Sequence, residues 1–287
     1  METAAKLDEI GYWSEVKLDI VREYAAAYSQ ILAAQEYKGR PQFKHCYIDG
    51  FAGAGVHVTK DTHEFKLGSP INALLVEPPF SEYHFIDLDG DRVDGLREND
   101  LVKTRGATVH HGDCNNVLLK TLLPTFDFKS FRKALLVLDP YGINLDWEVV
   151  RTAGQLGTVE IFLNFMVMDM NRNVFWKNWQ GVKEDSLTRM DHFWGDRSWK
   201  DVVYDRQPDL FGGEIVTKKA GNEPIVEAYR ERLKKVAGFK YVPDPVPMRN
   251  AQGSVVYYLF FAAQKPAATD IVTSIFDKYR SRAAGTG

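Results

Sequence analysis

The chain has 287 residues, of which 45% are hydrophobic and 26% charged, and its formal net charge at pH 7 is −3. This composition is typical of a globular protein, and the length fits one core domain that carries an insertion or an appendage. The near-neutral charge excludes a wholly basic, nucleic-acid-binding surface, although it leaves room for a local basic patch.

No stretch approaches the roughly 18 uninterrupted apolar residues of a membrane span, and charged residues stand where a signal peptide has its apolar run. The two cysteines, Cys46 and Cys114, are too few for a disulfide framework and lack the paired spacing of a zinc site. We therefore expect a cytoplasmic protein without membrane contact or a bound metal.

The first predicted element is a helix over residues 13–35, where apolar residues recur at helical spacing and Ser14 is placed to cap the first turn. We assign residues 1–40 to an N-terminal helical segment that precedes the core. The stretch "KHCYIDGFAGAG" then predicts a buried strand that runs into a glycine turn. The next helix is predicted at "GSPINALLVE", because Ser69 suits an N-cap and Pro70 suits the first helical position.

Three further segments repeat the pattern of an apolar strand, an acidic residue and a helix. They are "EYHFIDLDGDRVDGLREN" with Asp87, "ATVHHGDCNNVLLKTL" with Asp113 and "KALLVLDPYGINLDW" with Asp139, and "VEIFLNFMV" follows as a fifth strand. Strands that are apolar throughout and alternate with helices indicate a parallel sheet covered on both faces. We therefore predict an α/β fold with a mostly parallel sheet.

Residues 169–222 differ from this pattern because they are rich in tryptophan and mixed charge, and we predict a helical insertion that serves as a lid or as a substrate or partner surface. Its interleaved aromatic and basic residues fit single-stranded nucleic acid, or else the tryptophans form the insertion's own small core. An amphipathic helix and two strands joined by an "NAQG" turn follow. The core thus comprises residues 41–168 and 223–287 and ends in an antiparallel strand pair.

Four acidic residues, Asp49, Asp87, Asp113 and Asp139, stand at predicted strand exits. Ligands of open parallel sheets bind outside the carboxyl ends of the strands, so these four side chains would share one cleft. Each of them is also a residue type that caps helices and forms turns, which is the alternative interpretation.

The turn "YIDGFAGAGVH" discriminates among possible cofactors. A dinucleotide fingerprint requires a third glycine where this chain has Val58, and a phosphate-binding P-loop requires a Lys-Ser or Lys-Thr pair that does not follow here. A glycine turn that lets the backbone approach a ligand without directing a helix at pyrophosphate suits a cofactor that lacks phosphate. The turn therefore favours S-adenosylmethionine.

"DGFAGAG" resembles the D-x-F-x-G-x-G turn of class I S-adenosylmethionine-dependent methyltransferases, and "DPYG" resembles the D/N-P-P-Y/F motif of enzymes that methylate amino groups of adenine or cytosine. Together with "W-S-x-x-K" from Trp13 to Lys17 and "GSP" from Gly68 to Pro70, these motifs are similar to those of the three-Cys-motif partner proteins. The resemblance covers the part of the chain before the insertion. It implies a Rossmann-like methyltransferase fold and a cysteine-motif, radical-enzyme-like protein as a partner.

The resemblance also implies a set of residues that bind the methionine part of the cofactor. Gly53 and Gly55 would let the backbone pass close to it, and Asp49 would lie near its ammonium group. Phe51, in the same turn, belongs to this set.

For the adenosine part, the resemblance implies three further residues. Asp87 would accept hydrogen bonds from the ribose hydroxyls, because one carboxylate can take both. Asp113 would lie beside the adenine amino group, and Cys114 would lie against the ring. A plain helix cap for Asp113 and a small buried side chain for Cys114 are the alternatives.

The chemistry is expected at "DPYG". Asp139 and the carbonyl of Pro140 would accept the two hydrogens of an amine, and Tyr141 would stack on the acceptor ring. This chain has one proline where the usual motif has two, so Tyr141 is shifted by a residue, and a plain structural turn is the alternative. A base within a duplex would first have to be flipped out.

We therefore expect an S-adenosylmethionine-dependent methyltransferase that acts on an amino group, with a nucleobase in nucleic acid as a candidate acceptor. The alternative is a non-catalytic, methyltransferase-like partner of the cysteine-motif protein. A nucleotide-binding or hydrolytic α/β protein is a third possibility.

Overall fold

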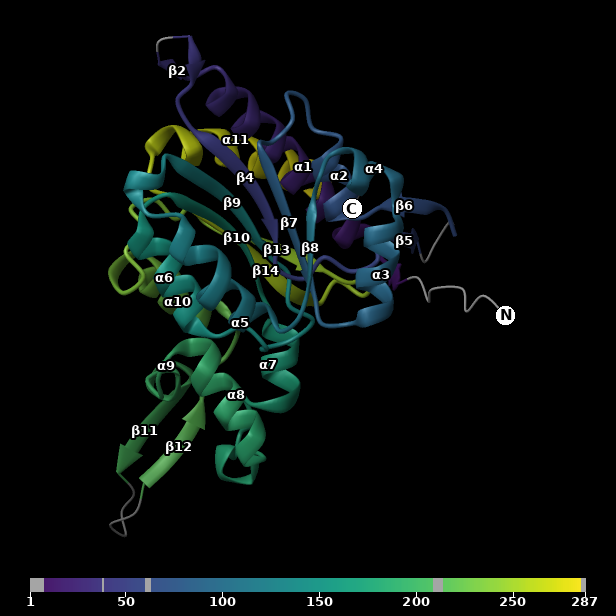
Figure 1. Ribbon diagram of the computed structural model, residues 1–287. Coiled ribbons are helices and arrows are strands. Elements are labelled where there is room, and N and C mark those ends of the chain that lie inside the picture. The colour runs from purple at the N-terminus through teal and green to yellow at the C-terminus, as the bar shows by residue number, and fades with distance from the viewer. Residues whose placement is uncertain (1–7, 38, 60–62, 209–213, 285–287) are drawn as a thin grey trace.

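The computed structural model describes residues 8–37, 39–59, 63–208 and 214–284. At its centre lies a seven-stranded sheet with the order β13-β14-β10-β9-β4-β7-β8 (Figure 1). The strands are β4 (Lys44–Asp49), β7 (Glu82–Asp87), β8 (Thr108–His111), β9 (Arg132–Leu138), β10 (Val159–Phe165), β13 (Val246–Arg249) and β14 (Val255–Ala262).

The first core strand, β4, lies in the middle of this sheet. It pairs in parallel with β7 on one side and with β9 on the other, and β8 and β10 continue the parallel pairing outward. The order therefore reverses at β4, as in doubly wound sheets. The last two strands are antiparallel, since β14 pairs in this sense with both β10 and β13. The predicted Rossmann-like α/β fold with a C-terminal antiparallel pair is confirmed.

Helices cover both faces of the sheet, and a separate hydrophobic cluster fills each side. One face carries α1 (Tyr12–Ala33), α2 (Ser69–Leu74), α3 (Gly90–Glu98), α4 (Asp100–Thr104) and α11 (Pro266–Ala284). The other carries α5 (Cys114–Val117), α6 (Trp147–Leu156) and α10 (Glu223–Lys235), with the π-helix η1 (Leu118–Leu122) and the 3₁₀ helix η2 (Leu123–Thr125). A second 3₁₀ helix, η3 (Phe128–Ser130), precedes β9. Among the described helices, none combines the length and the apolar character needed to cross a bilayer.

The N-terminal helix, which the sequence analysis assigned to a segment in front of the core, packs within the core. α1 packs beside α11, and its Tyr24 lies 4.7 Å from the Phe261 ring of β14 between ring centres. Two predicted caps are wrong. Gly11 is the N-cap of α1, which therefore begins before Ser14, and Ser69 is the first residue of α2. The Ser69 hydroxyl donates to the buried carboxylate of Asp49 and does not cap its own helix.

Three small sheets lie outside the main one. β1 (Asp8–Ile10) pairs with β5 (Val56–Thr59), which pairs with β6 (Phe65–Leu67). β2 (Glu36–Tyr37) pairs with β3 (Arg40–Pro41). β11 (Tyr204–Pro208) pairs with β12 (Glu214–Lys218) and forms a hairpin.

This hairpin lies inside the predicted helical insertion, and the sequence did not reveal it. Only the first residue of β11 is buried, and a polar strand of this kind has no apolar alternation to reveal it in sequence. The helices of the insertion are α7 (Val167–Asn173), α8 (Glu184–Trp194), α9 (Trp199–Val203) and the short η4 (Trp179–Gly181). They lie beyond the carboxyl ends of the strands (Figure 1).

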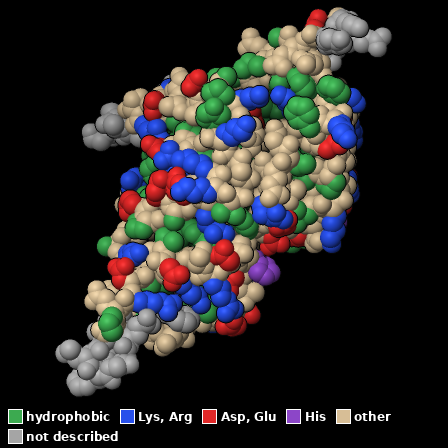
Figure 2. Space-filling model, turned by 90° about the vertical axis from the view of Figure 1, so that its left-hand side faces the viewer, with side chains coloured by type: hydrophobic (Ala, Val, Ile, Leu, Met, Phe, Trp, Pro, Cys, Tyr) green, Lys and Arg blue, Asp and Glu red, His purple; other side chains and the backbone are tan. Residues whose placement is uncertain are grey.

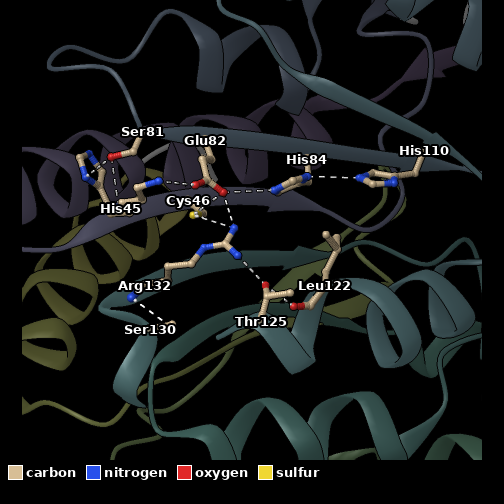
Figure 3. Close-up of polar contacts among 11 residues, drawn as sticks. His45, Cys46, Ser81, Glu82, His84, His110, Leu122, Thr125, Ser130 and Arg132 are labelled. Atoms are coloured by element: carbon tan, nitrogen blue, oxygen red, sulfur yellow. Dashed lines mark hydrogen bonds and ion pairs between the residues drawn. The ribbon is translucent and has the colours of Figure 1, made fainter. Parts of the chain in front are cut away.

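A chain of polar contacts links three strands of the main sheet (Figure 3). The rings of His110 and His84 are joined at 3.2 Å, and His84 lies 3.7 Å from Glu82. Glu82 in turn pairs with Arg132, the first residue of β9. The contacts tie β8, β7 and β9 together.

Candidate functional site

Two cavities lie at the carboxyl edge of the sheet. One, of about 630 Å³, is lined by residues that follow β4, β7 and β8. The other, of about 330 Å³, is lined by residues that follow β4, β9 and β10 and by residues of α1. Phe51 and Tyr141 line both cavities, so the two spaces adjoin at these rings.

The larger cavity contains two of the predicted acids. Asp87, at the end of β7, is 8% exposed, and its two carboxylate oxygens accept the backbone N–H groups of Gly53 at 2.8 Å and Asp89 at 2.9 Å. Each oxygen has a second lone pair for a ligand. Asp113 accepts the N–H of Asn116 at 2.9 Å and thus caps α5 while lining the cavity. The two interpretations of Asp113 are therefore compatible.

The wall behind these acids is formed by Cys114 and Gly50. Burial raises the pKa of the Cys114 thiol well above its ordinary value, and Asp113 raises it further, so the side chain is a neutral apolar surface. A Cβ at Gly50 would lie 2.8 Å from this sulfur, which explains a glycine that sequence reasoning overlooked. Within the described residues, no group of three or more His, Cys, Asp or Glu side chains is arranged to hold a metal ion.

The glycines of the turn have different surroundings. Both Gly53 and Gly55 have positive φ angles, +65° and +79°, which favour glycine. Gly53 lines the smaller cavity, and a Cβ there would have no atom within 4 Å. A Cβ at Gly55 would lie 3.0 Å from Leu96 and 3.1 Å from Ile71, and Gly55 lines neither cavity. Packing against neighbouring helices therefore accounts for Gly55.

Asp49 also lies behind the cavity walls. It is fully buried, accepts the N–H of Phe51 at 3.1 Å and accepts the hydroxyl of Ser69. Burial raises the pKa of Asp49 to about 6, although these two hydrogen bonds act in the opposite direction. In this structure the carboxyl group holds the glycine turn against the start of α2.

Asp139 lines the smaller cavity and is held from two sides. Its carboxylate pairs with the ammonium group of Lys17 and accepts the side-chain amide of Asn164. Burial disfavours the charge of Lys17, but Asp139, Tyr257 and Asp49 together outweigh burial, and the pKa of Lys17 is raised. Sequence reasoning gave Lys17 and Asn164 no role. The sequence signal for Lys17 was its place in the "W-S-x-x-K" motif. In the structure, α1 positions Lys17 at the carboxyl edge of the sheet.

The residues after Asp139 form the boundary between the cavities. Pro140 is buried and lines the smaller one. Tyr141 is 64% exposed, and its hydroxyl accepts a hydrogen bond from Arg92 at 2.9 Å. A Cβ at Gly142 would lie 2.8 Å from the carboxylate of Asp169, which accepts the next backbone N–H at 3.0 Å. Asp169, at the start of the insertion, therefore holds the backbone of this loop in place.

No family model matches the chain, and no curated protein sequence matches it. Among solved structures, an S-adenosylmethionine-dependent methyltransferase from Clostridium acetobutylicum has 10% identity and a TM-score of 0.39, covering 86% of this chain and 91% of the other. A putative methyltransferase from Escherichia coli has 13% identity and a TM-score of 0.34, covering 85% and 86%. A protein from Legionella pneumophila has 13% identity and a TM-score of 0.40, covering 76% and 91%. The resemblance to three-Cys-motif partner proteins rests on the sequence motifs alone.

Proposed function

We propose that the chain is an S-adenosylmethionine-dependent methyltransferase that transfers a methyl group to an amino group, with a nucleobase as the candidate acceptor. One observation carries the proposal: two cavities adjoin at Phe51 and Tyr141, beside the strand where the sheet order reverses. Such a pair can hold a cofactor and an acceptor side by side, which is what a direct group transfer requires.

The larger cavity fits the adenosine half of the cofactor. Asp87 retains lone pairs for two ribose hydroxyls, and Cys114 offers an apolar wall for a flat ring. Asp113 would lie beside the amino group of the ring. The open space at Gly53 would let the methionine end reach toward the smaller cavity. When bound, the cofactor supplies an electrophilic methyl group on a sulfonium.

The smaller cavity would receive the amine. An exocyclic amine is a weak nucleophile while its lone pair is delocalised into the ring. Hydrogen bonds from its two hydrogens to the Asp139 carboxylate and the Pro140 carbonyl would favour a pyramidal nitrogen and orient its lone pair. Lys17 would hold the Asp139 carboxylate in place through their ion pair, so it acts as a positioning residue.

The insertion offers little support for binding a long nucleic acid. Its Trp194 and Trp199 are 1% and 0% exposed, so these rings lie in the hydrophobic cluster shared with the sheet and cannot stack on bases. Two of its basic residues pair with acids, Arg197 with Asp191 at 2.9 Å and Lys219 with Asp205 at 3.4 Å. Figure 2 likewise shows Lys and Arg mixed with Asp and Glu on that face. We therefore assign acceptor recognition to the smaller cavity.

One observation favours the non-catalytic alternative. Both carboxylate oxygens of Asp139 already accept hydrogen bonds within the protein, from Lys17 and Asn164. A carboxylate that only fastens α1 to β9 and β10 would have the same contacts. The chain would then keep its cofactor pocket and serve as a partner of the cysteine-motif protein.

The variant Asp139→Ala distinguishes the methyltransferase from the non-catalytic alternative. We expect the variant to lose methyl transfer by about 100-fold or more, because the amine loses its main acceptor, while cofactor affinity stays nearly unchanged. The measurements are uptake of label from methyl-labelled cofactor into fractionated DNA, RNA and nucleosides, and calorimetric titration of the cofactor.

A matched control is needed because Lys17 would lose its partner, and an unpaired buried charge costs about 3–5 kcal/mol. The double variant Lys17→Met/Asp139→Asn removes both charges, and Asp94→Asn changes an exposed acid of α3. Undiminished transfer by Asp139→Ala would contradict the assigned role. Cofactor binding without labelling of any fraction by the unmodified protein would favour the non-catalytic alternative, and absence of cofactor binding would contradict both.

A further inference from the structure

A separate cavity of about 490 Å³ lies at the opposite edge of the sheet. It is bounded by the last turns of α1, the first turn of α11 and the amino ends of β9 and β10. Its walls are largely apolar and include Tyr24, Tyr28, Leu32, Phe43 and Ile271. The proposed methyl transfer uses none of these residues.

Two lysines line this cavity without a counterion. Lys133, near the start of β9, is partly buried, and its ammonium group lies 4.4 Å from the centre of the Phe43 ring. In the described part of the chain, the ammonium groups of Lys133 and Lys265 form no hydrogen bond and no ion pair. Burial lowers the pKa of Lys133, and Lys265 lowers it further, against the opposing effect of Glu160. An anion placed between the two ammonium groups would relieve this repulsion.

Glu160 lines the same cavity but offsets the charge of the two lysines only in part. Its carboxyl group accepts the hydroxyl of Tyr24 at 2.5 Å, and it forms no ion pair with Lys133. Burial raises the pKa of Glu160 to about 7, although the Tyr24 hydrogen bond opposes this. Near neutral pH a large share of this carboxyl is therefore uncharged, and it can donate a hydrogen bond to an acidic ligand.

We propose that this cavity binds a small organic anion, a carboxylate carried by an aromatic or branched apolar body. The acidic group would lie between Lys133 and Lys265, and the amides of Gln35 and Gln42 at the same wall would supply further donors. The apolar body would lie against the tyrosine rings. The volume of the cavity limits the ligand to the size of a small molecule.

Three probes of one shape test the charge that the cavity prefers: benzoate, the neutral benzamide and the cationic benzamidine. We expect calorimetry to detect benzoate alone, and Lys133→Met to weaken its binding about tenfold, because a charge-assisted hydrogen bond is lost while the apolar stem remains. Lys120→Met, an exposed lysine outside the cavity, should bind benzoate as the unmodified protein does. Binding of benzamidine in place of benzoate, or of no probe, would overturn the proposal.

A second variant covers the case in which Lys133→Met fails to fold. Ala267 is exposed in the first turn of α11 and lines the cavity, so Ala267→Trp should fill it and abolish benzoate binding. Both variants should bind S-adenosylmethionine as the unmodified protein does, because that site lies at the other edge of the sheet. Unchanged benzoate affinity in Ala267→Trp would show that the probe binds elsewhere, which would also overturn the proposal.

Discussion

Asp87 combines two roles at the end of β7, because the carboxylate that faces the larger cavity also holds the glycine turn through the N–H of Gly53. A ligand-binding residue with such a bond is fixed in place before the ligand arrives. This pre-organisation reduces the entropy that binding has to overcome.

Asp87→Ala should therefore lower the affinity for S-adenosylmethionine by about tenfold or more, because the ribose loses an acceptor and the turn loses its anchor. Calorimetric titration measures this, and circular dichroism checks that the variant is folded. Asp94→Ala, an exposed change on the neighbouring helix α3, is the control. Equal affinities in the two variants would argue against a cofactor in the larger cavity.

At the scale of elements, a histidine pair joins β7 to β8. Burial lowers the pKa of His84, and the neighbouring His110 lowers it further, whereas Glu82 acts in the opposite direction and Arg132 adds to the lowering. The folded state thus favours the neutral form of the His84 ring, whose contacts with His110 and Glu82 are drawn in Figure 3. The unfolded chain binds a proton at His84 more readily than the folded protein does. The stability that the neutral ring contributes is therefore complete above the ordinary histidine pKa of about 6.5 and is lost as the pH falls below it.

We expect His84→Gln to reduce the loss of stability between pH 7.5 and pH 5.5 by about 1 kcal/mol. Urea unfolding of the variant and of the unmodified protein at both pH values measures this difference. The variant has to be compared with the unmodified protein because Asp49 and Glu160 have raised pKa values. Their contributions to stability therefore increase as the pH falls over this range, opposite to that of His84. An identical pH dependence in the two proteins would contradict the role of the pair.

For the whole molecule, the insertion and the sheet share one hydrophobic cluster. The Phe193 ring of α8 stacks on Tyr229 of α10 at 5.6 Å between centres, and Tyr229 lies 4.6 Å from Phe165 of β10. The insertion thus has no core separate from that of the sheet, although its sequence differs from the rest of the chain.

We therefore expect one cooperative unfolding transition, in which tryptophan fluorescence and far-ultraviolet circular dichroism change together. Trp199→Ala, which empties a fully buried site in α9, should lower the free energy of unfolding by about 3–5 kcal/mol. Both signals should shift by the same amount. Two separate transitions would show that the insertion unfolds alone.

The sequence by itself determined the parallel sheet and most of the carboxyl-edge residues. Strand apolarity is a local property, and an acid that follows a buried strand must lie at its carboxyl end, so Asp87, Asp113 and Asp139 could be placed without a structure. The polar hairpin of the insertion escaped prediction because its strands lack apolar alternation.

Only the tertiary structure decided which residues meet. Asp49 and Gly55 belong to the same stretch as Phe51, yet neither lines a cavity: the Asp49 side chain is buried against Ser69 of α2, and Gly55 lies against Ile71 of α2 and Leu96 of α3. Lys17 reaches Asp139 across 122 positions of sequence because α1 crosses the sheet to its carboxyl edge. Sequence motifs identify the residue types of a site, whereas packing between distant elements selects which of them line its walls.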